Sequence, residues 1–137
     1  MKVKISDIEF NNPINDGTFG IHLYEGDKLT GFVFENWTDT DILKTEYEVK
    51  NGLQDGLEKC YYQDGKLESQ IEYKKGREHG EARYYDENGE LIEKIIFEYG
   101  IGISYEIYEN GILSNREDIE EDSAEYRNLL RFRELKG

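Results

Sequence analysis

The side chains best suited to catalysis are scarce in this chain. Among its 137 residues are two histidines, His22 and His79, and one cysteine, Cys60. No spacing pairs a nucleophile with a base, so His79 is expected in a solvated loop and Cys60 as a small residue in an alternating strand. Zinc needs several Cys or His ligands, and no calcium loop of the D-x-D-x-D-G type occurs. We expect a protein that is not an enzyme and has no cofactor or metal, with calcium on the acidic surface left open.

The charge balance narrows the choice of partners. Asp and Glu number 31 against 17 Lys and Arg, which gives a formal net charge of -14. Such a chain is repelled by nucleic acid and by anionic lipid, whereas a basic protein would be attracted to it. The acidity has an alternative explanation, which is that it only maintains solubility. The single cysteine, the absence of a signal-peptide pattern and the lack of any run near 18 apolar residues favour a cytoplasmic protein without a membrane span.

One period of 24 residues runs through the chain. Gly52, Gly76 and Gly100 show it most clearly, and four columns of apolar residues share it. These columns hold Leu43, Leu67 and Leu91; Tyr47, Ile71 and Ile95; Val49, Tyr73 and Phe97; and Trp37, Tyr61 and Tyr85. Each repeat is therefore predicted to be one supersecondary unit that buries its apolar face against its neighbours.

Each unit is predicted to be a β-hairpin. Asp64-Gly65 and Asn88-Gly89 lie between apolar runs, and such pairs favour hairpin turns because they tolerate positive φ. In the first unit, Asp41 takes the place of the turn glycine, so that turn is expected to differ. The glycine pairs Gly52 with Gly56 and Gly76 with Gly80 are expected to form the loops between hairpins. Strands are predicted near 42–49, 57–62, 67–74, 81–86, 91–98 and 103–108, with Tyr61, Leu67, Tyr85 and Leu91 largely buried.

The two ends of the chain match no repeat. Apolar residues from Val3 to Phe10 suggest an opening strand. A hairpin around Glu25-Gly26-Asp27 is suggested by Ile21, Leu23, Leu29, Phe32 and Phe34. From Asp122 the spacing becomes helical, which predicts a helix near 122–135 with Asp122 or Ser123 as its N-cap. Ile92 and Ile96 lie on the face that is polar in the preceding repeat, so this helix is expected to cover them; a dimer contact is the alternative.

The repeats resemble MORN-type repeats, in the variant found in many bacterial antitoxin-like and immunity-like proteins. The resemblance rests on Gly56, Tyr61, Gly65, Leu67, Tyr73 and Gly76, and on Gly80, Tyr85, Gly89, Leu91, Phe97 and Gly100. It implies an open, twisted antiparallel sheet of successive hairpins. We expect one domain, 1–137, in the mainly β class, with an N-terminal β cap at 1–30, repeats at 31–114, and an acidic segment followed by a C-terminal helix at 115–137.

Two functions are compatible with these features. The first is a cytoplasmic immunity protein or antitoxin that covers the basic cleft of a toxin, such as a nuclease. The second is a general scaffold for protein interaction. Carboxylates on one sheet face or in the acidic segment would steer the partner, and tyrosines would anchor it. The residues predicted to bind the partner are Glu46, Glu48, Tyr62, Glu68, Glu72, Tyr84, Asp118 and Glu121.

Overall fold

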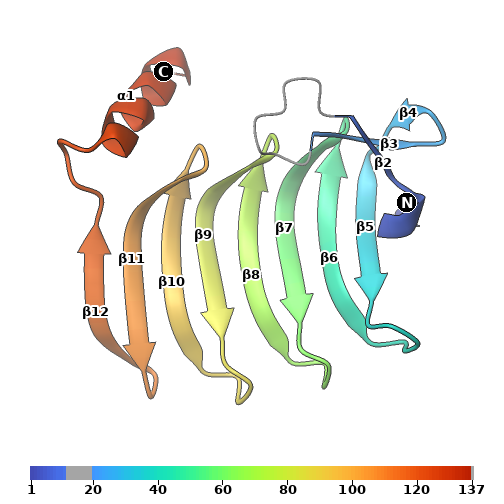
Figure 1. The fold of residues 1–137 in the computed structure, drawn as a ribbon, viewed down its shortest axis with the longest axis horizontal. Coiled ribbons are helices and arrows are strands. Elements are labelled where there is room, and N and C mark those ends of the chain that lie inside the picture. The colour runs from blue at the N-terminus through green and yellow to red at the C-terminus, as the bar shows by residue number, and fades with distance from the viewer. Residues whose placement is uncertain (12–19, 137) are drawn as a thin grey trace.

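The computed structural model describes residues 1–11 and 20–136, with the side chains of 1–11 and 20–135, as Figure 1 shows. Nine strands form one sheet in the order β1-β5-β6-β7-β8-β9-β10-β11-β12, and three short strands form a second sheet, β2-β3-β4. From β5 to β12 every neighbouring pair is antiparallel, and β1 joins β5 in parallel. The predicted mainly β fold of successive hairpins is confirmed. The N-terminal cap predicted at 1–30 includes 12–19, which lie outside the described residues.

The strands and helices have the following bounds. The large sheet contains β1 (Lys2–Lys4), β5 (Gly31–Asn36), β6 (Leu43–Lys50), β7 (Leu53–Tyr61), β8 (Leu67–Lys74), β9 (Arg77–Tyr85), β10 (Leu91–Glu98), β11 (Ile101–Glu109) and β12 (Ile112–Asp118). The small sheet contains β2 (Glu9–Asn11), β3 (Ile21–Tyr24) and β4 (Asp27–Lys28). A 3-10 turn, η1 (Ile5–Asp7), separates β1 from β2, and α1 (Ala124–Lys136) ends the chain.

Two kinds of turn alternate along the sheet from β5 to β11, and the β11–β12 turn at Asn110-Gly111 is a two-residue turn at the lower edge. At the upper edge in Figure 1, two-residue turns such as Lys75-Gly76 have positive φ at both positions, which matches the right-handed twist of the flanking strands. At the lower edge, which we call the long-turn edge, the turns at 62–66 and 86–90 close through Tyr62 N–H to Lys66 O and Asp86 N–H to Glu90 O. The first turn at this edge closes one residue later, from Trp37 to Ile42. The expectation that it differs is confirmed.

The predicted loops at Gly56 and Gly80 were wrong. Both glycines lie inside strands, at the places where the register with the preceding strand shifts. Each has φ of +114°, and a Cβ would meet the Glu48 or Glu72 side chain of that strand. Glycine therefore permits a bulge here rather than a loop. As a result β7 and β9 begin four residues before their predicted starts.

The N-terminal segment packs on one end of the large sheet. The main core cluster there joins Val3, Leu29, Val33, Tyr47 and Val49. His22 is buried beside it, with Nε2 2.9 Å from the Tyr47 hydroxyl and Nδ1 3.1 Å from the carbonyl of Gly52. The predicted opening strand is interrupted by η1, and Phe32 and Phe34 belong to β5 rather than to the Glu25-Gly26 hairpin. The core thus depends on contacts between the segment before β5 and the first two long strands.

Most repeat residues are less buried than predicted. Tyr61, Leu67, Tyr85 and Leu91 are all half-buried, because no second layer covers the described part of the sheet around them. The residues that are buried in the middle strands are small or central, such as Ala82 and Ile95. Trp37 also departs from its predicted column. Since the first turn is one residue longer, its side chain corresponds in position to Tyr62 rather than to Tyr61.

The C-terminal helix was predicted within two residues at each end. Ser123 is the N-cap, and its hydroxyl accepts a hydrogen bond from Tyr126 N–H at 3.1 Å. Phe132 stacks on Tyr99 in the β10–β11 turn, and Arg133 pairs with Glu98 at 2.8 Å. Ile96 lines a groove together with Leu129 of the helix, whereas Ile92 is 40% exposed. The helix therefore covers only the upper end of this face, and the prediction for Ile92 was wrong.

His79 contacts the β10–β11 turn, on which α1 also packs. Its Nδ1 accepts a hydrogen bond from Tyr99 N–H at 3.1 Å, and its ring meets the Tyr99 ring edge-on. The side chain is half-buried, so the prediction of a solvated loop histidine was wrong. Sequence spacing missed this contact because His79 lies in β9 and reaches the next two-residue turn, twenty residues later.

Candidate partner-binding surfaces

The two faces of the large sheet differ in chemistry. Residues that pair directly across strands share a face, so the strand register defines each face as a set of rows. One row runs Val3, Val33, Tyr47, Glu58, Ile71, Ala82, Ile95, Tyr105 and Glu117. We call the face that carries this row the aromatic face. Another row runs Lys4, Phe34, Glu46, Lys59, Gln70, Arg83, Lys94, Glu106 and Arg116, and we call its face the charged face.

The aromatic face carries carboxylates and no cation along its middle strands. Its positions in β7 to β10 are occupied by Gln54, Gly56, Glu58, Cys60, Leu67, Ser69, Ile71, Tyr73, Glu78, Gly80, Ala82, Tyr84, Leu91, Glu93, Ile95 and Phe97. None of these is Lys or Arg. By contrast, Lys59, Arg83 and Lys94 of the same strands belong to the row on the charged face. The basic residues of these rows are therefore segregated onto one side of the sheet.

Glu58 lies at the centre of the aromatic face. Gln54 Nε2 donates to its carboxylate at 3.0 Å. Burial raises the pKa of Glu58, and the nearby carboxylate of Glu78 raises it further, while the Gln54 hydrogen bond opposes both effects. Burial is also the main reason that the pKa of Tyr73 is raised. A carboxylate held beside a like charge and half removed from water favours the approach of a positive group.

Tyr84 and Cys60 extend this environment. Burial raises the pKa of Tyr84, and the negative charges of Glu93, Glu78 and Glu58 raise it further. Burial likewise raises the pKa of the Cys60 thiol, whose sulfur lies 3.4 Å from the Thr45 hydroxyl. A raised thiol pKa keeps the neutral form at physiological pH. Cys60 therefore acts as a small strand residue here, as its alternating context predicted.

The charged face neutralises much of its own charge. Lys2 pairs with Glu46 at 2.9 Å, and Lys94 pairs with Glu106 at 3.5 Å. Arg83 contacts Glu81 on the same strand. Such alternation is typical of a solvated sheet face whose charges stabilise cross-strand neighbours. This face is therefore the weaker candidate for attracting a basic partner.

The two faces of the sheet are covered by different elements, at opposite ends of the sheet. The N-terminal segment packs on the aromatic face at β5 and β6, through Val33, Tyr47 and Val49. At the other end, α1 borders the charged face, since its Tyr126 and Leu129 line a groove with Lys94 and Glu106. Among the described residues, the aromatic face from β7 to β12 has no covering element, and Tyr105 and Ile107 there are 39% and 38% exposed. Figure 1 shows α1 and the N-terminal elements at opposite ends of the sheet.

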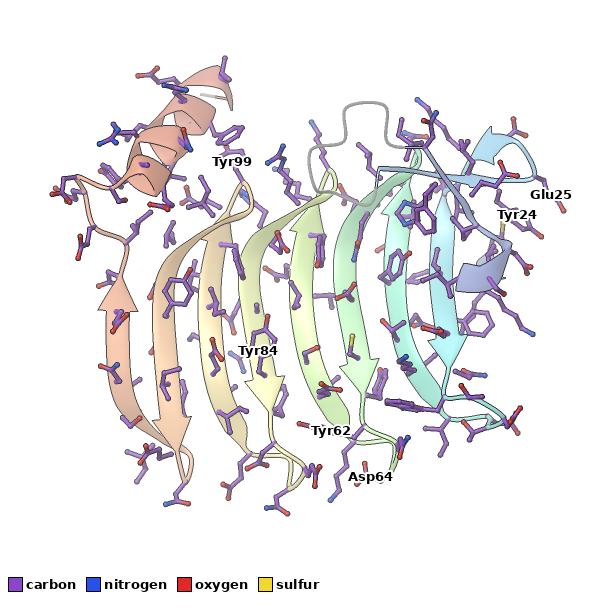
Figure 2. All side chains as sticks on the ribbon, viewed as in Figure 1. Tyr24, Glu25, Tyr62, Asp64, Tyr84 and Tyr99 are labelled. Atoms are coloured by element: carbon purple, nitrogen blue, oxygen red, sulfur yellow. The ribbon has the colours of Figure 1, made fainter. Side chains whose placement is uncertain are left out.

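The structure does not bring the predicted partner-binding residues together. Glu46, Glu48 and Glu72 lie on the charged face, so they do not share a surface with Tyr84 as predicted. Tyr62 and Glu68 lie near each other at the long-turn edge, where Figure 2 labels Tyr62. Asp118 ends β12 beside α1, and Glu121 lies in the turn before the helix.

Sequence reasoning missed Glu58, Tyr73, Glu78 and Glu93 as members of one surface. The available signal was alternation in the strands before each turn. Glu58 and Cys60 alternate with Lys59 in β7, just as Ala82 and Tyr84 alternate with Arg83 in β9. Glu78 continues this alternation through Gly80, but it was missed because the segment from Gly76 to Gly80 was predicted to be a loop.

The comparison with protein families agrees with the repeat pattern. A family model described as a MORN repeat variant matches residues 54–75 and 78–99. These are the β7–β8 and β9–β10 hairpins, which carry most of the uncovered aromatic face. The repeats suggest a scaffold for protein interaction. No curated protein matches this sequence.

Two features of the described residues bear on other functions. No helix among them has the length and apolar character needed to cross a membrane. No group of three or more His, Cys, Asp or Glu side chains in this part of the chain is arranged to hold a metal ion.

Proposed function

We propose that this protein is a repeat scaffold that captures a basic protein partner on its aromatic face. The observation that carries the proposal is the segregation of charge. Glu58, Glu78 and Glu93 lie among tyrosines on a face without Lys or Arg in β7 to β10. Tyrosines supply rigid contact area, and carboxylates of one sign attract and orient a basic surface.

The size of the aromatic face suits such a partner. From β7 to β12 there are five strand spacings of about 4.8 Å, and strands of this length extend about 25 Å, so the face covers roughly 600 Å² before side-chain relief is counted. A stable protein–protein interface buries roughly 800 Å² on each partner. The uncovered face supplies about three-quarters of this area, so a partner of standard size would also contact the rim of the sheet.

We further propose that the partner is a toxin that this chain neutralises by occlusion, without catalysis or a cofactor. The net charge of -14 and the resemblance of the repeats to those of antitoxin-like proteins support this choice. In this mechanism the carboxylates pair with basic side chains of the toxin, while Tyr73 and Tyr84 pack against it. The toxin then cannot reach its own substrate. Steering by opposite charge would speed capture at low salt.

Co-expression tests this function. The wild-type chain should restore growth to cells that express the toxin encoded beside it, and association should slow as salt rises, since exposed charges are screened beyond about 8 Å at physiological ionic strength. If no toxin is encoded nearby, or if rescue fails although the two proteins are both present, the immunity function is wrong. Capture of a basic partner that is not a toxin would then support the general scaffold.

A further inference from the structure

A second surface, separate from the aromatic face, lies at the long-turn edge. Trp37, Tyr62, Gln63, Asp64, Glu68 and Glu87 line a groove of about 460 Å³, which we call the turn groove. Its walls come from three successive turns, those after β5, β7 and β9, and from Glu68 at the start of β8. Figure 2 labels Tyr62 and Asp64 at this edge, away from Tyr84 on β9.

Both aromatic rings of the turn groove are fixed through their polar atoms. The indole N–H of Trp37 donates to the carbonyl of Tyr61 at 3.3 Å, and the hydroxyl of Tyr62 donates to the carbonyl of Tyr85 at 2.6 Å. Each ring thus reaches from one hairpin to the next. Because the polar atoms are already used, the rings present mainly their π surface and apolar edges to a ligand.

The carboxylates of the turn groove form no ion pair with a described residue, although the ammonium groups of Lys44 and Lys66 lie close to the groove. Glu68 and Glu87 form no ion pair with any described residue, and Asp64 Oδ1 accepts the backbone N–H of Lys66 at 2.9 Å. The Lys66 ammonium lies nearby, but it donates to the backbone carbonyl of Glu87 at 3.3 Å. Burial raises the pKa of Tyr62, and so do Glu68, Glu87, Asp86 and Asp64. Four carboxylates therefore act on one aromatic ring.

One wall of the turn groove already contacts a cation of the chain itself. Lys44 Nζ lies 5.1 Å from the centre of the Trp37 ring, within the range of a cation–π contact. A planar guanidinium is suited to both features of the turn groove, since it stacks on an aromatic ring and donates to carboxylates in its own plane.

We propose that the turn groove binds an arginine side chain of a protein partner. The guanidinium stacks against Trp37 and Tyr62 and donates hydrogen bonds to Glu68 and Glu87. The site goes beyond the proposed function, because it requires neither a toxin nor the aromatic face. A partner that also contacts the aromatic face would gain affinity from holding both surfaces at once.

The single tryptophan makes this site directly observable. Because Trp37 is the only tryptophan, its indole N–H gives one assignable signal in a ¹H–¹⁵N spectrum. The probe is a capped tri-arginine peptide, titrated at constant ionic strength. The Trp37 indole signal should shift and saturate, whereas a capped tri-citrulline peptide, neutral and of similar shape, should not shift it. Tri-lysine should bind more weakly than tri-arginine.

Two substitutions test the assigned carboxylates. E68Q and E87Q should each weaken tri-arginine binding roughly two- to fivefold, the range for an exposed ion pair, and the double variant should weaken it further. E109Q, which changes an exposed carboxylate of β11 outside the turn groove, should leave binding unchanged. Retained signal dispersion would show that the variants fold.

Three results would overturn the assignment. They are an indole signal that does not saturate, equal affinity for tri-lysine and tri-arginine, or equal weakening by E109Q and E68Q. Each would mean that the peptide senses net charge rather than this groove. None of these outcomes alters the co-expression result, so failure of the groove and failure of the proposed function can be told apart.

Discussion

Val33→Ala tests whether the N-terminal segment is part of the folded core. Val33 has no exposed surface and contacts residues of both the N-terminal segment and β6. Removing two methyl groups at about 0.8 kcal/mol each, with a cavity term added, should lower the free energy of unfolding by about 2 kcal/mol. With an unfolding entropy of about 2.1 cal/mol/K per residue, a chain of 137 residues loses about 7 °C in Tm.

Ile112→Ala provides the control. It removes one carbon more than Val33→Ala, but Ile112 is 71% exposed on the edge strand β12. Its loss should cost under about 1 kcal/mol, mainly through strand propensity, and lower Tm by under about 4 °C. Thermal and urea unfolding followed by circular dichroism measure both variants. Equal shifts, or a change at Val33 below half a kilocalorie, would refute the assignment of the core to this end of the sheet.

Three further predictions concern the ends and the turns. Burial lowers the pKa of His22, so the folded state takes up a proton on this side chain less readily than the unfolded state, and the stability that His22 contributes should fall as pH drops below about 6.5. Between pH 7.5 and pH 5, the urea midpoint of the wild type should therefore fall more steeply than that of His22→Gln. Parallel pH profiles would contradict this. Gly80→Ala should destabilise the protein more than Gly89→Ala. Both glycines have positive φ, but only at Gly80 would the added Cβ meet a side chain, since it would lie 3.2 Å from Glu72 Cβ. Equal urea midpoints for the two variants would argue against the bulge. Deletion of 122–137 should lower Tm and promote aggregation, because it uncovers Ile96 and removes Phe132 from Tyr99. An unchanged Tm together with a monomeric protein by light scattering would show that α1 does not stabilise the sheet.

The repeated hairpins could be predicted because their signals are local. Asp64-Gly65 and the alternation of 67–74 define a turn and a strand without any distant contact, and the structure has β8 at those residues. The C-terminal helix could be predicted for the same reason, since the cap at Ser123 and the apolar spacing after it depend on neighbours within one helical turn.

The errors came from contacts between distant segments. Gly56 and Gly80 carry a loop-like sequence signal, but pairing with the preceding strand turns them into bulges. Tyr84 was placed with Glu72, but it pairs with Ser69, and Glu72 points to the other side of β8, so the two lie on opposite faces. His79 was assigned to solvent because its partner, Tyr99, belongs to the next turn of the sheet. In each case the register across strands, not the local pattern, decides the environment.

The distribution of charge over the two faces could not be predicted from the sequence either. Composition gives the net charge of -14 but not its distribution. Only the register shows that Lys59, Arg83 and Lys94 share the charged face, and that Glu58 and Glu93 lie opposite them among tyrosines. The sequence-based choice of the polar face of the alternating strands, with Glu68 and Glu72, therefore selected the face that is partly neutralised.

The most direct test of the central claim compares two matched double variants in binding to the captured partner. E78K/E93K changes the aromatic face, and E48K/E72K changes the charged face; each raises the net charge by four from -14. Binding kinetics measured by surface plasmon resonance at physiological salt should show that E78K/E93K weakens binding at least tenfold more than E48K/E72K, with both variants folded by circular dichroism. Equal losses would mean that net charge alone attracts the partner, and a larger loss for E48K/E72K would place the interface on the charged face.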